Sequence, residues 1–288
     1  RQHIEYVMPI IKEALDEAGV DMHDIDHIGV TYGPGLVGAL LVGVAAAKAL
    51  SFALDKPLVG VNHMEGHIFA NFLSHPELEP PFLALVVSGG HTQLVKIKGY
   101  NSFELLGQTR DDAAGEAFDK IARVMGYPYP GGPQIDALAK KGNPDAITFP
   151  KALHEKHNFE FSFSGLKSAV LNYLHTQKQR HAGYSPEDVA ASFQKTVVET
   201  LVEKTMDAAR WSGMTNIAVA GGVAANSGLA AAMEAACAKR QYTLYRPDPI
   251  LCTDNGAMIG CRAYYMAIDG RFADLTLNAR PALSITTC

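Results

Sequence analysis

Positive charge is scarce in this sequence. Its 288 residues include 25 Lys and Arg against 30 Asp and Glu, which gives a formal net charge of −5. A protein that holds nucleic acid over its whole surface needs a surplus of basic residues, so the composition argues against that mode of binding. An RNA substrate would have to meet a local basic patch or a partner subunit.

Cysteine pairs and long hydrophobic runs are also missing. The four cysteines form no CxxC pair, which favours free thiols in a reducing compartment, by default the cytoplasm. A membrane-spanning helix needs about 20 predominantly apolar residues. The longest candidate, residues 36–54, is interrupted by Gly38, Gly43 and Lys48. We therefore expect a buried helix there and no contact with a membrane.

Apolar residues are plentiful, at 48% of the chain, and they fall into short strands that alternate with helical patterns. The predicted strands are 27–31, 58–61, 82–87, 93–98 and 217–220. The predicted helices are 4–18, about 36–54, about 63–73, 257–265 and one that starts near 226. This alternation is typical of the α/β class, with a mostly parallel sheet covered by helices.

A Pro-rich link at residues 75–81 is the predicted boundary between two lobes. The first predicted domain is 1–78, an α/β lobe. The second is 79–288, an α/β lobe with a helical insertion at about 111–204 and a C-terminal helix. A cleft between the two lobes is the simplest arrangement.

The segment HMEGH carries two histidines, His63 and His67, four positions apart. On a helix both imidazoles leave the same face one turn apart and can bind one metal ion. A third ligand is needed, and the best candidate is Asp254 in the polar segment CTDNG. The alternatives are two solvated or packed histidines and an ordinary helix cap at Asp254.

HMEGH differs from the zinc-protease motifs. Glu65 lies two residues after His63, about 200° around the helix, and cannot face the same ion. A metallopeptidase would therefore lack its general base. Two histidines and one carboxylate with open positions suit Fe(II) or Zn(II), and the identity of the ligands does not choose between these two metals.

Three glycine loops border predicted buried elements, and their backbone N–H groups could bind phosphate oxygens. They are Gly89-Gly90, Gly131-Gly132 and Gly221-Gly222. Together they suggest a nucleotide cleft, although each alone is also an ordinary turn. Between them, DDAAGEAFDK places Asp112, Glu116, Asp119 and Lys120 along one helical band. Asp119 could bind a ribose, and the alternative is a solvated charged face.

Eight motifs follow one another along the chain: GPGLVGAL, HMEGH, VSGGHTQ, DDAAGEAFDK, YPGGP, FSFSGLK, AGGVAAN and CTDNGAMI. Their combination resembles the tRNA adenosine threonylcarbamoyltransferase family of the bacterial or organellar type, formerly described as O-sialoglycoprotein endopeptidases. The resemblance runs from His3 to about Arg280. It implies a two-lobed, ribonuclease H-like fold of the actin, Hsp70 and sugar-kinase type, here without the N-terminal part of the first lobe.

The resemblance also implies a site. The metal ligands would be His63, His67 and Asp254, and they would hold one divalent metal per chain, with Fe(II) favoured and Zn(II) possible. The nucleotide part of threonylcarbamoyl-AMP, or ATP or ADP, would meet Val86, Val87, Ser88, Gly89, Gly90, Asp119, Gly132, Asp136 and Asn226. The threonylcarbamoyl group would be transferred directly to the exocyclic amine of the adenosine 3′ of the anticodon, in tRNAs that read codons beginning with A. No catalytic residue is assigned, and His91 is only considered as a general base.

The implied partners are tRNA, a catalytically dead paralogous subunit and a small ATPase subunit. Two other functions are weighed against this one: a metal-dependent glycoprotein endopeptidase and a non-catalytic ATP-binding scaffold. The first would cleave peptides with its metal, and the second would need no metal ligands. For tRNA we predict a basic patch that includes Lys151, Lys156, Lys178 and Arg180.

Overall fold

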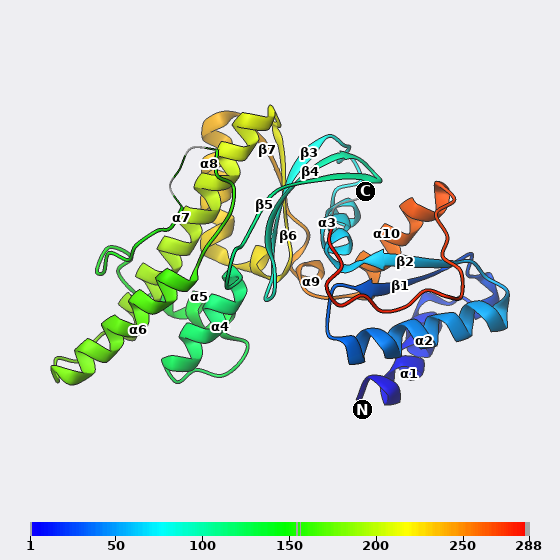
Figure 1. Cartoon of the computed structure of the whole chain (residues 1–288), viewed down its shortest axis with the longest axis horizontal. Helices are drawn as coiled ribbons and strands as arrows, with labels where there is room; N and C mark the ends of the chain where they lie inside the picture. Colours follow the sequence, from blue (N-terminus) through cyan, green and yellow to red (C-terminus); the bar gives the residue numbers. More distant parts are fainter. Residues whose placement is uncertain (1, 154, 156, 286–288) are drawn as a thin grey trace.

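The computed structural model describes residues 2–153, 155 and 157–285, and these residues contain a small and a large sheet (Figure 1). The small sheet pairs β1 (Ile28–Gly33) with β2 (Leu58–Asn62) in parallel. The large sheet has the strand order β5-β4-β3-β6-β7. The predicted α/β class is confirmed.

The large sheet is mixed rather than mostly parallel. Its strands are β3 (Phe82–Val87), β4 (Thr92–Gly99), β5 (Ser102–Gln108), β6 (Asn216–Ala220) and β7 (Thr243–Tyr245). β3 pairs antiparallel with β4 and parallel with β6, and all its six residues are buried. A central strand covered on both faces explains why its sequence, FLALVV, is continuously apolar.

Helices surround both sheets. They are α1 (Gln2–Ala18), α2 (Val37–Leu54), α3 (His63–Ser74), α4 (Ala114–Val124), α5 (Gly131–Ala139), α6 (Ser164–Gln179), α7 (Pro186–Ser212), α8 (Ser227–Arg240), α9 (Pro249–Cys252) and α10 (Gly256–Ile268). Two short 3-10 helices are η1 (Met22–Asp24) and η2 (Gly222–Ala225). The predicted elements agree with these bounds within a few residues, whereas β5 and β7, the two edge strands of the large sheet, were not predicted.

α2 differs from its predicted burial. It is long and apolar enough to cross a membrane by length and composition alone, and only 22% of it is buried. The buried positions are Leu40, Val44, Ala47 and Ser51, which form one stripe. That stripe packs towards β1 because the helix lies along one side of the small sheet, so Leu41 and Phe52 stay exposed. The expectation of a buried helix is wrong for most of its surface.

The C-terminal helix, α10, follows the strands of the large sheet in the chain but packs on the small sheet. α10 packs on α3 and on both strands of the small sheet (Figure 1). Beyond it, Ala273 bridges Leu58, and the Arg280 N–H donates to the carbonyl of Tyr32. We therefore propose a division into lobes that groups residues 256–285 with 2–78, whereas the sequence suggested a single cut after residue 78.

α3 lies at the junction of the two sheets. One side packs on the large sheet, where Phe69 and Phe72 belong to the same hydrophobic cluster as Phe82 and Val86. It also packs on α10, whose Tyr265 ring contacts both Phe69 and Phe72, and its N-terminus continues directly from β2. The helix that carries the predicted metal-binding histidines is therefore held by both halves of the molecule.

Candidate metal centre and adjoining cavity

The two histidines of HMEGH open α3. Asn62 caps this helix, because its side-chain oxygen accepts a hydrogen bond from the N–H of Met64. The cap fixes the first turn, and the four-residue spacing then places the rings of His63 and His67 on one face with centroids 4.7 Å apart. His67 is almost fully buried at 1% exposure, and His63 is 21% exposed.

Asp254 reaches the histidines from the loop before α10. One of its carboxylate oxygens lies 3.3 Å from Nε2 of His63 and 3.2 Å from Nε2 of His67. The helix-cap role that Asp254 might have filled belongs to Asn255, whose side chain accepts from the N–H of Met258. The structure thus brings together the three residues predicted as ligands, and we call them the metal corner.

The metal corner fits a divalent ion. Both ring nitrogens of His67 lack a hydrogen-bond partner within the described residues, although the ring is buried. Such orphaned atoms are rare in proteins, and an ion bound by one nitrogen would satisfy it. One ligand atom from each of the three residues lies within 4.8 Å of the others. The imidazoles of His63 and His67, whose Nε2 atoms lie 3.3 and 3.2 Å from the Asp254 carboxylate, hold the pKa of that carboxyl well below its usual range.

His91, in the turn between β3 and β4, stands close to the same two histidines. Burial lowers the pKa of its imidazole, and charge on His63 and His67 lowers it further. A lowered pKa favours the neutral form of the ring. A neutral imidazole can accept a proton, which keeps His91 under consideration as a base without assigning it that role.

A cavity of about 420 Å³ adjoins the metal corner. Five residues predicted to bind the nucleotide line it: Gly89, Asp119, Gly132, Asp136 and Asn226. Thr253, the residue before Asp254, is part of the same wall, so the cavity and the metal corner are neighbours. The volume lies within the usual range for small-molecule sites, about 300–1,000 Å³.

The other predicted residues of the first glycine loop lie elsewhere. Val86 and Val87 are fully buried in β3. Ser88 closes the turn, because its N–H donates to the carbonyl of His91 and its hydroxyl accepts from the His91 N–H. Gly90 is exposed, and a side chain added there would meet no protein atom within 4 Å. Of these residues, only Gly89 borders the cavity.

The carboxylates of the cavity wall already have partners. Asp119 accepts a hydrogen bond of 2.7 Å from the N–H of Gly131, which ties α4 to the start of α5. Asp136 accepts from the Ser227 hydroxyl at 2.8 Å and from Gln194 at 3.1 Å, and it pairs with Lys140. Burial alone would raise the pKa of Asp136, but these hydrogen bonds outweigh it and lower the pKa.

Gln194, on α7, was not predicted from the sequence. Its side-chain oxygen accepts a 2.8 Å hydrogen bond from Asn226, while its amide nitrogen donates to Asp136. The oxygen of Asn226 in turn accepts from the N–H of Leu229 and caps α8. These bonds fix which way the Asn226 amide points. No motif marks Gln194, and its only signal is an amide on a helix face that is otherwise largely apolar.

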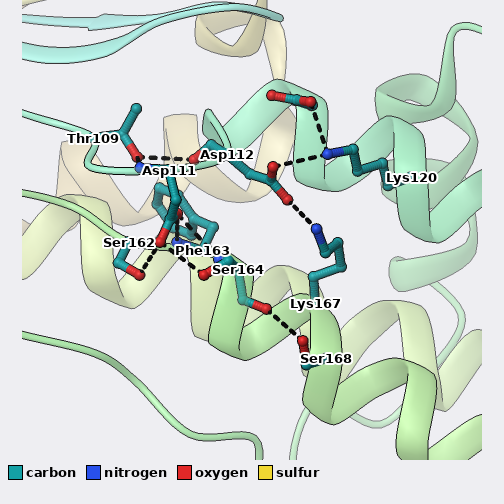
Figure 2. Close-up of polar contacts among 10 residues, drawn as sticks. Thr109, Asp111, Asp112, Lys120, Ser162, Phe163, Ser164, Lys167 and Ser168 are labelled. Carbon is teal, nitrogen blue, oxygen red and sulfur yellow. Dashed lines mark hydrogen bonds and ion pairs between the residues drawn. The ribbon is translucent and has the colours of Figure 1, made fainter.

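Two of the sequence motifs, DDAAGEAFDK and FSFSGLK, are joined by Asp111 (Figure 2). Its carboxylate accepts hydrogen bonds from the N–H groups of Phe163 and Ser164 and from the hydroxyls of Ser162 and Ser164. Burial raises the pKa of Asp111, but these bonds outweigh it and lower the pKa. Asp111 therefore caps α6 from a distant part of the chain.

Asp112 extends this connection (Figure 2). Its carboxylate lies 2.8 Å from the ammonium of Lys120 on α4 and 2.6 Å from that of Lys167 on α6. Lys120 also pairs with Glu116. The charged band of DDAAGEAFDK is thus partly a solvated face and partly a bridge that holds α4, with its cavity residues, against α6.

Three glycines allow the cavity walls to approach closely. A Cβ at Gly115 would stand 2.6 Å from the carbonyl oxygen of Ser88, and one at Gly131 would stand 2.7 Å from Cβ of Ala122. Gly221 has a φ of +90° and lies against the backbone of Val87. Only glycine fits such contacts, so these positions determine how near the loops come to one another.

Comparison with known proteins gives one consistent family. The family model described as tRNA N6-adenosine threonylcarbamoyltransferase matches residues 1–261. A curated relative of that name from Clostridium kluyveri is 56% identical over 286 residues, which cover 99% of this chain and 84% of the relative. One from Clostridioides difficile (strain 630) is 55% identical over 285 residues, with the same coverage.

Solved structures show the same fold at low identity. Full-length HypF, in its phosphate- and nucleotide-bound form, matches 92% of this chain and 42% of its own length, with a TM-score of 0.68 and 14% identity. The activator of the 2-hydroxyisocaproyl-CoA dehydratase from Clostridium difficile matches 92% of this chain and 81% of its own, with a TM-score of 0.53 and 16% identity. The predicted two-lobed, ribonuclease H-like fold is thereby confirmed.

Proposed function

The chain belongs to the tRNA N6-adenosine threonylcarbamoyltransferase family, and we propose that its metal corner and the adjoining cavity together form the active site. The chain is an acyltransferase that attaches a threonylcarbamoyl group to adenosine in tRNA. The proposal concerns which residues do this: His63, His67 and Asp254 would hold one divalent ion, and the cavity would hold the nucleotide of the donor.

One observation carries the proposal. Thr253 lines the cavity, and the next residue, Asp254, contacts both histidines. A nucleotide in the cavity would therefore have its reactive end beside the ion. Gly89, in the turn after β3, and Gly132 and Gly222, in the first turns of α5 and η2, line the cavity, where their N–H groups would be available to phosphate oxygens. The donor supported by this arrangement is an acyl adenylate, threonylcarbamoyl-AMP.

The reaction demands positioning more than a strong nucleophile. The exocyclic amine of adenosine is weakly nucleophilic because its lone pair is delocalised into the ring. It would attack the carbamoyl carbon, the bond from that carbon to the phosphate oxygen would break, and AMP and a proton would leave. Asp119, Asp136 and Asn226 would fix the nucleotide, so that the acyl carbon is held in place. A bound Fe(II) or Zn(II) would supply Lewis-acid polarisation of the carbonyl oxygen.

The alternative functions are not favoured. A metallopeptidase of the HExxH or HxxEH type needs a glutamate beside the ion, but Glu65 is buried and bound to Arg262 on the far side of α3. A scaffold that only binds ATP would need no orphaned histidine beside its cavity. The close relatives also carry the transferase name throughout.

The partners and the location follow from the family resemblance. We propose a catalytically dead paralogous subunit and a small ATPase as helpers, and the cytoplasm as the compartment. For tRNA, we propose a contact surface at Lys178 and Arg180, two residues of the predicted basic patch. Lys151 pairs with Glu199 and Glu203 on α7, and Lys156 lies outside the described residues. Lys178 and Arg180, at the exposed end of α6, remain as phosphate contacts.

Two measurements on the purified chain test the proposal. Elemental analysis should find about one Fe or Zn per chain, and His67→Ala should remove it. Transfer of the threonylcarbamoyl group to tRNA, assayed with the helper subunits, should fall with the metal content. Threonylcarbamoyl-AMP should still bind to His67→Ala through the cavity. Full transfer by a metal-free His67→Ala protein would contradict the proposed metal role.

A further inference from the structure

A buried ion pair connects the two helices that meet at the metal corner. Nε of Arg262 on α10 lies 2.6 Å from a carboxylate oxygen of Glu65 on α3, although 197 positions separate them in the chain. The two side chains are only 1% and 9% exposed. Charged groups are seldom buried so deeply without a specific role, because each loses its hydration.

Arg262 is held in place on every side. Its Nη1 donates to the carbonyl of Tyr100 at 3.0 Å and to the side-chain oxygen of Asn101 at 2.7 Å. Its guanidinium carbon lies 4.7 Å from the ring centroid of Phe69 and 5.2 Å from that of Phe103. A planar guanidinium with several donors and two aromatic contacts has one orientation, which a lysine could not reproduce.

On α3, the ion pair and the two proposed histidine ligands lie on opposite faces of the helix. Glu65 is two residues from His63 and two from His67, so it leaves α3 on the opposite face, towards α10. On the other helix, α10 begins at Gly256, directly after Asp254 and its neighbour Asn255. Glu65 and Arg262 therefore join the element that carries two ligands to the element that carries the third.

α3 and α10 are also in close contact beside this ion pair. Gly66 on α3 faces Ile259 on α10, and a Cβ at Gly66 would stand 2.6 Å from Cδ1 of Ile259. Apolar contact alone allows a helix to slide or rotate slightly, whereas a charge-assisted hydrogen bond at 2.6 Å fixes one register. The distance from Asp254 to the histidines depends on that register.

We infer that Glu65 and Arg262 are positioning residues for the metal corner: the pair fixes α10 on α3 so that Asp254 lies within ligand distance of His63 and His67. The inference rests on the proposed metal site. A buried ion pair adds little net stability compared with an apolar pair of similar size. Its expected contribution is therefore to metal affinity rather than to the fold.

Co²⁺ binding to the purified full chain, followed by visible absorption, tests this role. Glu65→Gln should weaken Co²⁺ binding by about tenfold or more and shift the absorption bands, because the ligand geometry changes. Glu65→Leu combined with Arg262→Met removes both charges. This double variant should regain the thermal stability lost in Glu65→Gln while Co²⁺ affinity stays low. Val170→Ala, in the core of the second lobe, is the control that loses stability and keeps Co²⁺ affinity.

The outcomes separate the two proposals. If the parent protein binds Co²⁺ no better than His67→Ala does, the metal site itself is wrong. If the parent binds Co²⁺ and Glu65→Gln binds it equally well, the metal site stands and the positioning role is overturned. If the double variant recovers Co²⁺ affinity together with stability, Glu65 and Arg262 only support the fold, and the inference is again overturned.

Discussion

The metal corner and the adjoining cavity are neighbours, yet their polar groups are satisfied in opposite ways. In the metal corner, both ring nitrogens of the buried His67 lack a hydrogen-bond partner among the described residues. In the cavity, Asp119, Asp136 and Asn226 are already hydrogen-bonded to protein groups. The metal corner therefore depends on its ligand to be complete, while the cavity is organised before its ligand arrives.

The largest expected effect comes from His67→Ala, which removes the buried ligand. Metal affinity should fall by about 100-fold or more, since loss of a direct ligand exceeds the 10- to 100-fold effect of an outer partner. Competition with a chromogenic chelator would measure it. His75→Ala is the matched control, because His75 lies at the end of the same helix and pairs with Glu77. Equal metal affinity in His67→Ala and His75→Ala would contradict the assignment of His67 as a metal ligand.

Removal of the ion should affect the two regions differently. Treatment with a chelator should lower the melting temperature of the parent protein, because the ion binds the folded protein and its loss removes that stabilisation. The same treatment should leave the melting temperature of His67→Ala unchanged. Binding of an adenine nucleotide to the cavity, measured by calorimetry, should survive the treatment. A loss of nucleotide binding would show that the two regions are one coupled site.

A pair of glycine variants separates fold from binding in the cavity. Gly221→Ala would put a side chain on a backbone with φ +90° and only 2.4 Å from the carbonyl oxygen of Val87, so it should lower the free energy of unfolding by about 2 kcal/mol or more. Gly90→Ala meets open space and should leave that free energy unchanged. Urea unfolding would measure both. Equal stability of the two variants would contradict the close packing assigned to Gly221.

Gln194→Met tests how firmly the cavity is organised. It removes the partner of Asn226 and Asp136, so nucleotide affinity should fall by about tenfold and stability by about 1–2 kcal/mol. Gln179→Met, at the exposed end of α6, is the control and should change neither quantity. Unchanged nucleotide affinity in Gln194→Met would mean that the cavity does not depend on this network.

The smallest effect is expected far from both regions, at the end of α6. Reversing Lys178 and Arg180 to Glu should weaken tRNA binding and reduce its salt slope by about one unit per lost phosphate contact. Lys239 and Arg240, in the last turn of α8, give a matched double reversal elsewhere on the surface. If both double variants bind tRNA alike, the RNA surface lies on another face or on a partner subunit.

Sequence reasoning predicted the local features of this protein well. The bounds of β3 agree with the predicted strand, and α3 begins at His63 as expected, because helix and strand periods are written into neighbouring residues. Prediction of the metal corner needed a further step, because its third ligand, Asp254, is distant in the sequence and was chosen as a polar residue before an apolar helix. The lobe division that we propose differs from the single predicted boundary after residue 78, because α10 packs on the small sheet. No local sequence pattern indicates that contact.

The sequence by itself determined which short segments become helices, strands and glycine turns, and it placed two histidines on one helical face. Tertiary structure alone decided which distant groups meet. Gln194 and Asn226 are hydrogen-bonded although 32 positions separate them in the sequence. The corresponding separation is 52 for Asp111 and Phe163 at the start of α6, and 197 for Arg262 and Glu65. Such contacts follow from the packing of whole elements, so their physical cause is the burial of apolar faces, which leaves each enclosed polar group to find a partner.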